Sequence, residues 1–496
     1  MTMKVNFGVK KSFLLTDFYE FSMANGYLIH DMHNKNAVFN YFFRKNPFKG
    51  GYAIVAGIEH FLDILSEFKF SDDDIEYLKS YETFSDNFLD YLSKMKNELT
   101  VWGMEDGQIA FANEPILQIS GPLIQCQLIE TLLLNSINYP TLCATKANRM
   151  WIASGKKMIL EFGARRAQGP NGALTATYAS LVGGCSGTSN VLAGKMLGIK
   201  ASGTMAHSWI SSFPSEYDAF KKFVDIYPNS AILLVDTYNT LKSGVPNAIK
   251  MGKYLEKKGR SLKAIRLDSG DMVRLSIESR RMLDEAGFKD VKIIISNDVD
   301  EYYIHEFENK GGKADIWGIG TKLVTCFDDP ALGGVYKLVE IDNEPKIKLS
   351  DEPAKITIPN KKSVLRFYKK DPTGCEKMMF DVIFDTSELE IKQLELHDKL
   401  QGLYFHDIYN QNKRYNMADF KFDKFEPLLK PLFSSGRRNN QKIGLFEAKA
   451  NMESGIKKME EKYLRLEKPE IYKILISDKL HKIRQELIQM ILKKEK

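Results

Sequence analysis

The middle third of the chain alternates short apolar runs with helix-like segments, and this alternation restricts the possible folds more than any other feature of the sequence. Between about residue 157 and about residue 321, each apolar run is followed by glycine or polar residues and then by a segment with helical periodicity. Such alternation is typical of βα units arranged around a parallel sheet. The expected strands span residues 158–162, 232–235, 264–267, 291–295 and 316–319.

This pattern predicts an α/β fold in which residues 146–340 form an irregular, TIM-like α/β barrel. Residues 1–145 and 341–496 are expected to form one flanking α+β domain built from both ends of the chain, with the barrel inserted between them. A basic amphipathic helix with Ile476 and Ile491 on its apolar face is expected at the C-terminus, docked on the protein or on a neighbouring subunit. Flanking strands are expected at residues 37–43, 108–110, 346–349 and 363–368.

The composition is that of an ordinary globular protein. The 496 residues are 44% hydrophobic, enough for two or three domains, and a net charge of +6 is too dilute to indicate nucleic-acid binding, although it suits small anionic substrates. The five cysteines show no metal-ligand spacing, and their odd number argues against a disulfide framework, which favours a reducing, cytoplasmic setting. Neither a signal peptide nor an apolar run of roughly 20 residues is found, so neither secretion nor a membrane partner is expected.

Polar residues at the ends of the expected strands are candidate site residues, because ligands of parallel α/β folds bind at the carboxyl ends of the strands. His207 lies among small and hydroxyl-bearing neighbours at 201–208, where an imidazole could act as a nucleophile toward phosphorus. A hydrogen-bonded core histidine is the competing interpretation. The pair Asp236-Thr237 and the run 296–298 end other strands of the same set.

The segment I-R-L-D-S-G-D places a cation and two carboxylates at the end of a strand. Arg266 could bind a carboxylate or phosphate in a planar, two-bond geometry, while Asp268 and Asp271 could hold Mg²⁺ or accept hydrogen bonds from sugar hydroxyls. Asp271 could equally well cap the helix that follows.

Two further strand ends carry candidate ligand contacts. The turn G-I-G-T supplies Gly318, Gly320 and the hydroxyl of Thr321, which suits phosphate binding, although a plain turn is an equally good interpretation. Phe162 could stack on a planar ring or fill the core, and Arg165 could contact an anionic group.

The order of these segments along the chain resembles that of the nicotinate phosphoribosyltransferases. The N-terminal segment with Tyr19 alone has only the character of an amphipathic helix, so the resemblance rests on all segments together. It extends from about residue 13 to about residue 340 and continues through L-G-G-V-Y-K-L-V at 332–339. The matching segments are L-L-T-D-F-Y at 14–19, E-F-G-A-R-R-A-Q-G at 161–169, G-T-M-A-H-S at 203–208, R-L-D-S-G-D at 266–271 and G-I-G-T-K-L-V-T at 318–325.

The resemblance implies an irregular α/β barrel with a flanking α+β domain, and a homodimer whose active sites lie at the subunit boundary. It implies that nicotinate and 5-phosphoribosyl-1-pyrophosphate are converted to nicotinate mononucleotide and pyrophosphate, with Mg²⁺ as cofactor and ATP as co-substrate. His207 would be phosphorylated by ATP, and Asp268 and Asp271 would serve the ribose or Mg²⁺. The family pattern assigns nicotinate contacts to Tyr19, Thr204 and Arg266, contacts to the pyridine ring and a phosphate to Phe162 and Arg165, and the 5-phosphate to Gly318, Gly320 and Thr321.

Three alternatives differ in substrate or class. A nicotinamide phosphoribosyltransferase would carry an acidic residue in the segment that matches 187–190, where this chain has Ser189. A carboxylate there would repel the carboxylate of nicotinate, so its absence favours the acid substrate. A barrel isomerase or aldolase acting on a sugar phosphate would explain the phosphate turn but not Arg165, His207 and Tyr19 together, and a non-catalytic scaffold would not need every motif intact.

Overall fold

The computed structural model divides at Thr145 and at Pro330 into two units. The first unit is Lys146–Pro330, and the second combines Lys4–Thr145 with Ala331–Lys496. The second division precedes the expected boundary at residue 340, because strand β12 (Gly334–Ile341) pairs with a strand of the second unit. The structure describes residues 13–350, 352, 355–388, 400, 402–410, 413–439 and 441–494.

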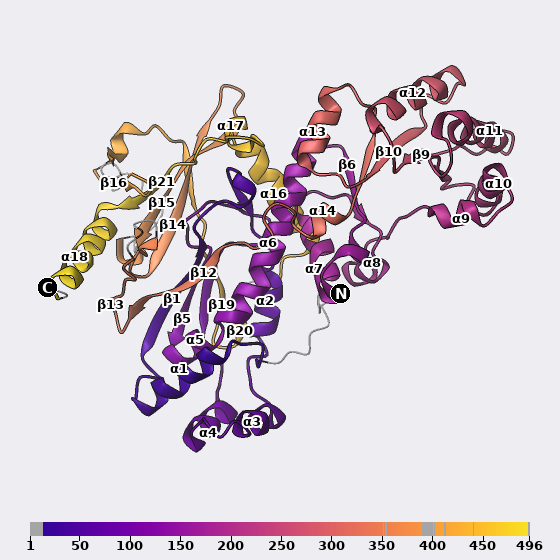
Figure 1. Cartoon of the computed structure of the whole chain (residues 1–496). Coiled ribbons are helices and arrows are strands. Elements are labelled where there is room, and N and C mark those ends of the chain that lie inside the picture. Colours follow the sequence, from indigo (N-terminus) through magenta and orange to yellow (C-terminus); the bar gives the residue numbers. More distant parts are fainter. Residues whose placement is uncertain are drawn as a thin grey trace. The chain divides into compact units, whose positions relative to one another are not determined.

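The first unit is built on a six-stranded parallel sheet in the order β7-β6-β11-β10-β9-β8. Figure 1 labels β6, β9 and β10 of this sheet. Parallel pairing joins each strand to its neighbour. Among the described residues, β7 and β8 are open edges and no pairing closes the sheet, so the expected barrel is not confirmed; closure of this kind takes about eight strands. The strands are β6 (Met158–Glu161), β7 (Gly187–Thr188), β8 (Ile232–Leu234), β9 (Ala264–Leu267), β10 (Lys292–Asn297) and β11 (Ile316–Ile319).

The strands of this sheet are apolar because helices and neighbouring strands bury them on both faces. Ile265, Leu267, Ile293, Ile295 and Ile319 are all fully buried. Continuous apolar runs of this length, bounded by polar residues, are what the sequence predicts as strands, and β9 and β11 have the predicted bounds. The residues that follow each strand are free to carry polar side chains.

Helix α12 (Met272–Glu285) shows how the sequence fixes a helix of this unit. Its N-cap is Asp271, whose Oδ1 accepts a hydrogen bond from the Arg274 backbone N at 3.1 Å. Leu275 and Leu283 lie on its buried face, and the helix packs against β9 and β10. The other helices of the unit include α7 (Gly169–Val182), α8 (Val191–Leu197), α9 (His207–Ser211), α10 (Glu216–Ile226), α11 (Val245–Glu256), α13 (Glu301–Asn309) and α14 (Thr321–Val324).

A seven-stranded sheet of the second unit joins the two ends of the chain, in the order β13-β12-β1-β5-β3-β19-β20. β1 pairs antiparallel with β12 and β5, and β3 pairs antiparallel with β19. The remaining bounds are β1 (Asn36–Phe43), β3 (Thr100–Gly103), β5 (Leu117–Pro122), β13 (Glu344–Pro345), β19 (Lys430–Ser434) and β20 (Arg437–Arg438). The helices before the first unit are α1 (Phe18–Ile29), α2 (Ile58–Leu65), α3 (Asp72–Lys79), α4 (Asp86–Lys94), α5 (Leu123–Leu128) and α6 (Glu130–Ala153), which continues across Thr145.

A second, six-stranded sheet of this unit has the order β17-β16-β21-β15-β14-β18. An aromatic core lies on it, in which the rings of Phe367 and Phe380 stack with their centroids 4.8 Å apart. The strand expected at 363–368 lies inside β14, but residues 346–349 form no strand and instead follow the hairpin of β12 and β13. The bounds are β14 (Lys362–Lys370), β15 (Glu376–Asp385), β16 (Tyr404–Asp407), β17 (Arg414–Asn416), β18 (Lys424–Pro427) and β21 (Ile474–Ser477); the two-stranded pair is β2 (Ala53–Ile54) with β4 (Ile109–Ala110).

The C-terminal helix α18 (Asp478–Lys494) begins later than expected, because Ile476 belongs to β21. Leu480 and Arg484 are buried on this helix, which packs against β15, β16 and β21. Helices α16 (Leu445–Lys458) and α17 (Glu461–Leu464) precede it. No helix in the described part of the chain combines the length and the apolar character needed to cross a membrane.

Candidate active site

Side chains from neighbouring strand ends of the first unit meet around Arg266. From β9, its Nε donates to Ser296 Oγ of β10 at 3.0 Å. Its Nη1 donates to Thr204 Oγ1 at 2.8 Å and to the Met205 carbonyl at 3.3 Å, and its Nη2 lies 3.4 Å from Asp268 Oδ1. Every guanidinium nitrogen of Arg266 therefore has an acceptor, which holds the group in one orientation.

Asp268 is the anionic centre of this cluster. Because Leu267 pairs with Ile295 in the parallel sheet, the next residues, Asp268 and Ser296, are adjacent, and Ser296 Oγ donates to Asp268 Oδ1 in a short hydrogen bond. Burial acts to raise the pKa of Asp268, but this bond and the charges of Arg266 and His207 together bring the pKa below its usual value. Asp268 is therefore a carboxylate at neutral pH.

His207 is the first residue of α9 and leaves 43% of its side chain exposed. Its Nδ1 lies 3.0 Å from Thr237 Oγ1, and its Nε2 lies 3.8 Å from Asp268 Oδ2. This placement excludes the core-histidine interpretation. In the tautomer that carries the proton on Nδ1, the Nδ1–H group donates a hydrogen bond to the Thr237 hydroxyl. Nε2 then has a free lone pair that can act as a nucleophile.

Asp236 and Ser296 also belong to this cluster, although the sequence marks them only as polar residues after strands and assigns them no role. Asp236 follows β8, and its Oδ2 accepts hydrogen bonds from the Asp268 backbone N at 3.1 Å and from Ser269 Oγ at 2.6 Å. Its Oδ1 is buried and has no hydrogen-bond partner in the described structure. In the sequence, the only indication that these two residues belong to a site is their position directly after the expected strands at 232–235 and 291–295.

The turn after β6 packs directly on β11. The Phe162 backbone N donates to the Ile319 carbonyl at 2.7 Å, and a Cβ added to Gly318 would lie 2.7 Å from Phe162 Cε2. Glycine at 318 is therefore required by the Phe162 ring, and Gly318 lies inside the sheet with β6 and β10 on either side. Of the G-I-G-T segment, only Gly320 and Thr321 belong to the turn beyond the strand.

The other predicted residues of the first unit lie outside the hydrogen-bonded cluster. Arg165 is exposed in a short turn (Ala164–Arg166), and it forms no hydrogen bond or ion pair with any residue that the structure describes. Thr321 is partly exposed at the start of α14. Asp271 is exposed and caps α12, so the capping interpretation describes its contacts.

Tyr19 belongs to the second unit, where it lies on α1 with 47% of its surface exposed. Partial burial raises the pKa of its hydroxyl to about 12, with a further contribution from the carboxylates of Glu130, Glu20 and Asp17. Tyr19 is therefore neutral at physiological pH and presents an uncharged aromatic ring to its surroundings.

The described residues contain no group of three or more His, Cys, Asp or Glu side chains arranged to hold a metal ion by themselves. Mg²⁺ in phosphoryl and pyrophosphate chemistry is usually bound through one or two carboxylates together with substrate phosphates and water. Asp236, with its unpartnered Oδ1, and the neighbouring carboxylate of Asp268 fit this mode of binding.

Family models match most of the chain. The model described as the nicotinate phosphoribosyltransferase (NAPRTase) N-terminal domain matches residues 14–138, the model of the NAPRTase family matches 158–378, and that of the C-terminal domain matches 361–484. The chain is 38% identical to the nicotinate phosphoribosyltransferase of Bacillus subtilis (strain 168), over 94% of this chain and 93% of that protein. It is 31% identical to the human nicotinate phosphoribosyltransferase, over 94% of this chain and 95% of that protein.

The fold is similar to those of two solved structures. The crystal structure of human nicotinic acid phosphoribosyltransferase matches with a TM-score of 0.82 and 28% identity, over 95% of this chain and 99% of that chain. The crystal structure of a nicotinate-nucleotide pyrophosphorylase from Pyrococcus furiosus matches in fold, with a TM-score of 0.67 and 24% identity, over 92% of this chain and 99% of that chain.

Proposed function

Because the chain belongs to the nicotinate phosphoribosyltransferase family, we propose that it joins nicotinate to 5-phosphoribosyl-1-pyrophosphate and releases nicotinate mononucleotide and pyrophosphate. This reaction is the first step of NAD salvage from nicotinate, and ATP hydrolysis is coupled to it. The observation that carries the proposal is the cluster of His207, Arg266, Asp268 and Ser296 at the carboxyl ends of the parallel strands. It offers a cation for a carboxylate, an anion for sugar hydroxyls and an exposed imidazole.

Arg266 binds the carboxylate of nicotinate. Its bonds to Ser296, Thr204 and Asp268 fix the guanidinium before substrate arrives, so little ordering entropy is lost on binding. The N–H groups of Arg266 then donate both to the substrate carboxylate and to these internal acceptors. The pyridine ring is thereby oriented so that its nitrogen faces the anomeric carbon of the donor.

In the transfer step, the ring nitrogen forms a bond to the anomeric carbon while the bond from that carbon to pyrophosphate breaks. Positive charge develops on the ribose ring during this step. The negative charge of the Asp268 carboxylate stabilises this positive charge, and the carboxylate also accepts a hydrogen bond from a ribose hydroxyl. Mg²⁺ held by Asp236, Asp268 and the substrate would neutralise the departing pyrophosphate. Asp271, which is exposed at the start of α12, contributes a second carboxylate on the ribose side in this proposal.

His207 accepts a phosphoryl group from ATP. Nε2 forms a bond to the γ-phosphorus, the bond from that phosphorus to the β-phosphate oxygen breaks, and ADP leaves. The hydrogen bond between Nδ1 and the Thr237 hydroxyl keeps the ring oriented during this step. Water then attacks the phosphohistidine, which breaks the N–P bond and releases phosphate, and this hydrolysis is coupled to mononucleotide formation.

The 5-phosphate of the ribose binds at the turn of Gly320 and Thr321, next to the exposed Arg165. Phe162 and Tyr19 contact the pyridine ring, and Tyr19 comes from the neighbouring subunit of a homodimer. The support for this part is the resemblance of the Tyr19, Phe162 and Thr321 segments to the family, and the neutral, half-exposed ring of Tyr19. A cytoplasmic setting agrees with the five cysteines, none of which forms a disulfide.

The substrate is the acid rather than the amide. Ser189 follows β7, at the edge of the parallel sheet, and its backbone N donates to the Glu161 carbonyl at 3.0 Å. A hydroxyl at this position does not repel a carboxylate substrate, whereas an acidic side chain would.

Product formation tests the proposal. Purified protein is incubated with 5-phosphoribosyl-1-pyrophosphate and either nicotinate, nicotinamide or quinolinate, each with and without ATP and Mg²⁺, and the mononucleotide is measured. We expect nicotinate mononucleotide, formed faster with ATP. If only nicotinamide gives a mononucleotide, the protein is a nicotinamide phosphoribosyltransferase. If no mononucleotide forms under any condition, the proposal is refuted.

A further inference from the structure

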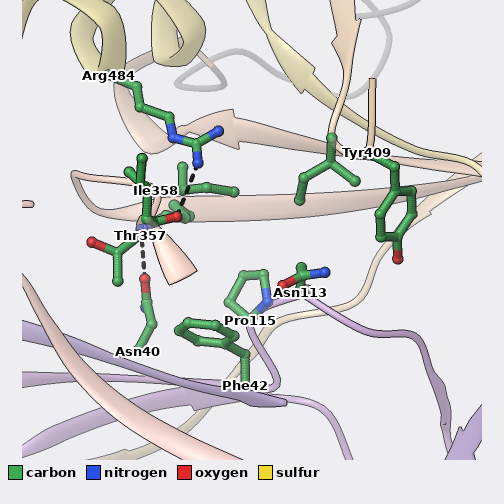
Figure 2. A pocket seen from close by; sticks show the side chains of 11 residues that line it. Asn40, Phe42, Asn113, Pro115, Thr357, Ile358, Tyr409 and Arg484 are labelled. Atoms are coloured by element: carbon green, nitrogen blue, oxygen red, sulfur yellow. Dashed lines mark hydrogen bonds between the residues drawn. The ribbon is translucent and has the colours of Figure 1, made fainter. Parts of the chain in front are cut away.

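A cavity of about 410 Å³ lies within the second unit and shares no residue with the candidate active site. Its walls come from β1, β14, α18 and the segments around residues 113–115, 356–358 and 408–409. Figure 2 shows Arg484, from α18, on one side of this space and Phe42 and Pro115 on the other. The volume is within the range of about 300–1,000 Å³ that is typical of small-molecule sites.

Arg484 is a buried cation that has no counter-ion among the described residues. It is only 4% exposed, and its Nη2 donates to the Ile356 carbonyl at 2.9 Å. Its Nε and Nη1 have no hydrogen-bond partner in the part of the chain that the structure describes. Burial lowers the pKa of Arg484, but a guanidinium remains protonated in proteins. A buried charge with free donors is costly unless an anion pairs with it.

Arg366 of the same unit shows the contrast. It is equally buried, and its Nε and Nη2 donate to the carboxylate of Asp381, the shorter bond being 2.6 Å. Within the described parts of the chain, an internal carboxylate thus pairs with the guanidinium of Arg366 and none pairs with that of Arg484. Among the described residues that line the cavity, none is acidic.

Lys362 is the second cation of the cavity, and two hydrogen bonds already hold its Nζ within the protein. Its Nζ donates to Asn40 Oδ1 at 2.6 Å and to the Asn360 carbonyl at 2.7 Å. Burial lowers the pKa of Lys362 well below its usual value, even though Glu340 and Asp385 act to raise it. Arg484 is therefore the cation that is left to bind a ligand.

We propose that this cavity binds a small aromatic monocarboxylate, whose carboxylate accepts hydrogen bonds from Arg484 and whose ring lies against the apolar wall. Phe42, Pro115 and Tyr409 form that wall, and the Tyr409 hydroxyl is already used, since it donates to the Ala112 carbonyl at 2.9 Å. One unpaired guanidinium balances one negative charge. A phosphate dianion would need a second free cation, whereas Lys362 is engaged in two internal hydrogen bonds.

The test is calorimetric titration of benzoate, benzamide and inorganic phosphate into the full chain. All proteins carry Arg266→Gln, so that a carboxylate cannot pair at the candidate active site. We expect benzoate to bind and benzamide not to bind. Adding Arg484→Gln should weaken benzoate binding roughly ten- to a hundredfold, the usual effect of losing a charge-assisted pair. Lys482→Gln removes an exposed charge from the same helix and should leave the affinity unchanged.

A second variant separates binding from folding. Arg484→Met, in the same background, replaces the unpaired charge with an unbranched apolar chain, so its Tm without ligand should equal or exceed that of the parent. Benzoate should raise the Tm of the parent and not that of the variant. The proposal is overturned if the parent does not bind benzoate, if Arg484→Gln binds it equally well, if phosphate binds as tightly, or if Arg484→Met lowers the Tm markedly.

Discussion

Ser296→Ala is the substitution that most sharply separates a positioned Arg266 from one that is merely nearby. The Ser296 hydroxyl accepts from Arg266 Nε at 3.0 Å and donates to the carboxylate of Asp268. The residue is 3% exposed, so water cannot readily replace the lost hydroxyl. The change therefore removes one hydrogen bond from Arg266 and one from Asp268, and it keeps both charges.

The size of the effect follows from these two bonds. A hydrogen bond to a charged group contributes about 1.5–3 kcal/mol. Arg266 keeps its bonds to Thr204 and Met205, so the expected loss of transition-state stabilisation is one such bond, about 2 kcal/mol, or roughly thirtyfold in kcat/KM for nicotinate. The Ser296 bond is also one of the groups that lower the pKa of Asp268, so the acidic limb of the pH profile should move to higher pH.

Steady-state kinetics of mononucleotide formation across a pH series measure both effects. Ser279→Ala is the matched control, because Ser279 is fully buried on α12 of the same unit and its hydroxyl has no hydrogen-bond partner within the described structure. It should leave the acidic limb in place. If Ser296→Ala changes kcat/KM by less than about threefold and its acidic limb coincides with that of Ser279→Ala, the cluster does not act through Ser296.

The remaining predictions address individual groups. Arg266→Lys keeps the charge but loses the planar fork, so the KM for nicotinate should rise roughly ten- to a hundredfold while ATP turnover changes little, and an unchanged KM removes Arg266 from the carboxylate site. Mixing Tyr19→Ala with His207→Ala should restore about half of the ATP-stimulated activity per mixed dimer after subunit exchange, because one shared site is intact; no recovery despite exchange refutes the shared site. Burial raises the pKa of Glu20 to about 7, against the hydrogen bonds from Thr131, so ionisation destabilises the fold increasingly from about pH 4 to about pH 7. Glu20→Gln should therefore gain unfolding free energy relative to wild type over that pH interval in urea titrations, and an equal difference at all pH values would contradict it.

Local patterns predict the strands of the parallel sheet because those strands are buried on both faces. β11 is a continuous apolar run between polar residues, and β9 is an apolar run that only Arg266 interrupts, so their bounds follow from this pattern. β7 is a Gly-Thr pair without an apolar run, so the sequence gives no sign of it. Residues 346–349 alternate like a strand but pair with no strand in the described part of the chain. The backbone N of Lys346 donates a hydrogen bond to the Val339 carbonyl directly after the hairpin. Closure of a sheet also depends on pairing between distant strands, which periodicity does not report.

The candidate site shows the same limit at the level of side chains. His207, Arg266 and Asp268 could be singled out because unusual residue types follow apolar runs. Their contacts with Ser296 and Asp236 depend on the pairing of β9 with β10 and β8, so the sequence marked these two residues only as polar strand ends. The sequence alone did not distinguish a site residue from a helix cap at position 271. In the structure, Asp271 Oδ1 accepts a hydrogen bond from the Arg274 backbone N, which is the contact of a helix cap.

The most direct test of the central claim is to follow the γ-phosphate of ATP onto the protein. The chain is incubated with ATP labelled at the γ-phosphate, and the acid-labile, base-stable label is located by peptide mapping. We expect label on the peptide that contains His207 and loss of that label when nicotinate and 5-phosphoribosyl-1-pyrophosphate are added. We expect no label in His207→Ala, whose slow ATP-independent synthesis persists. Label of the same stability in His207→Ala, or ATP-stimulated synthesis by that variant, would contradict the role of His207 as the phosphoryl acceptor.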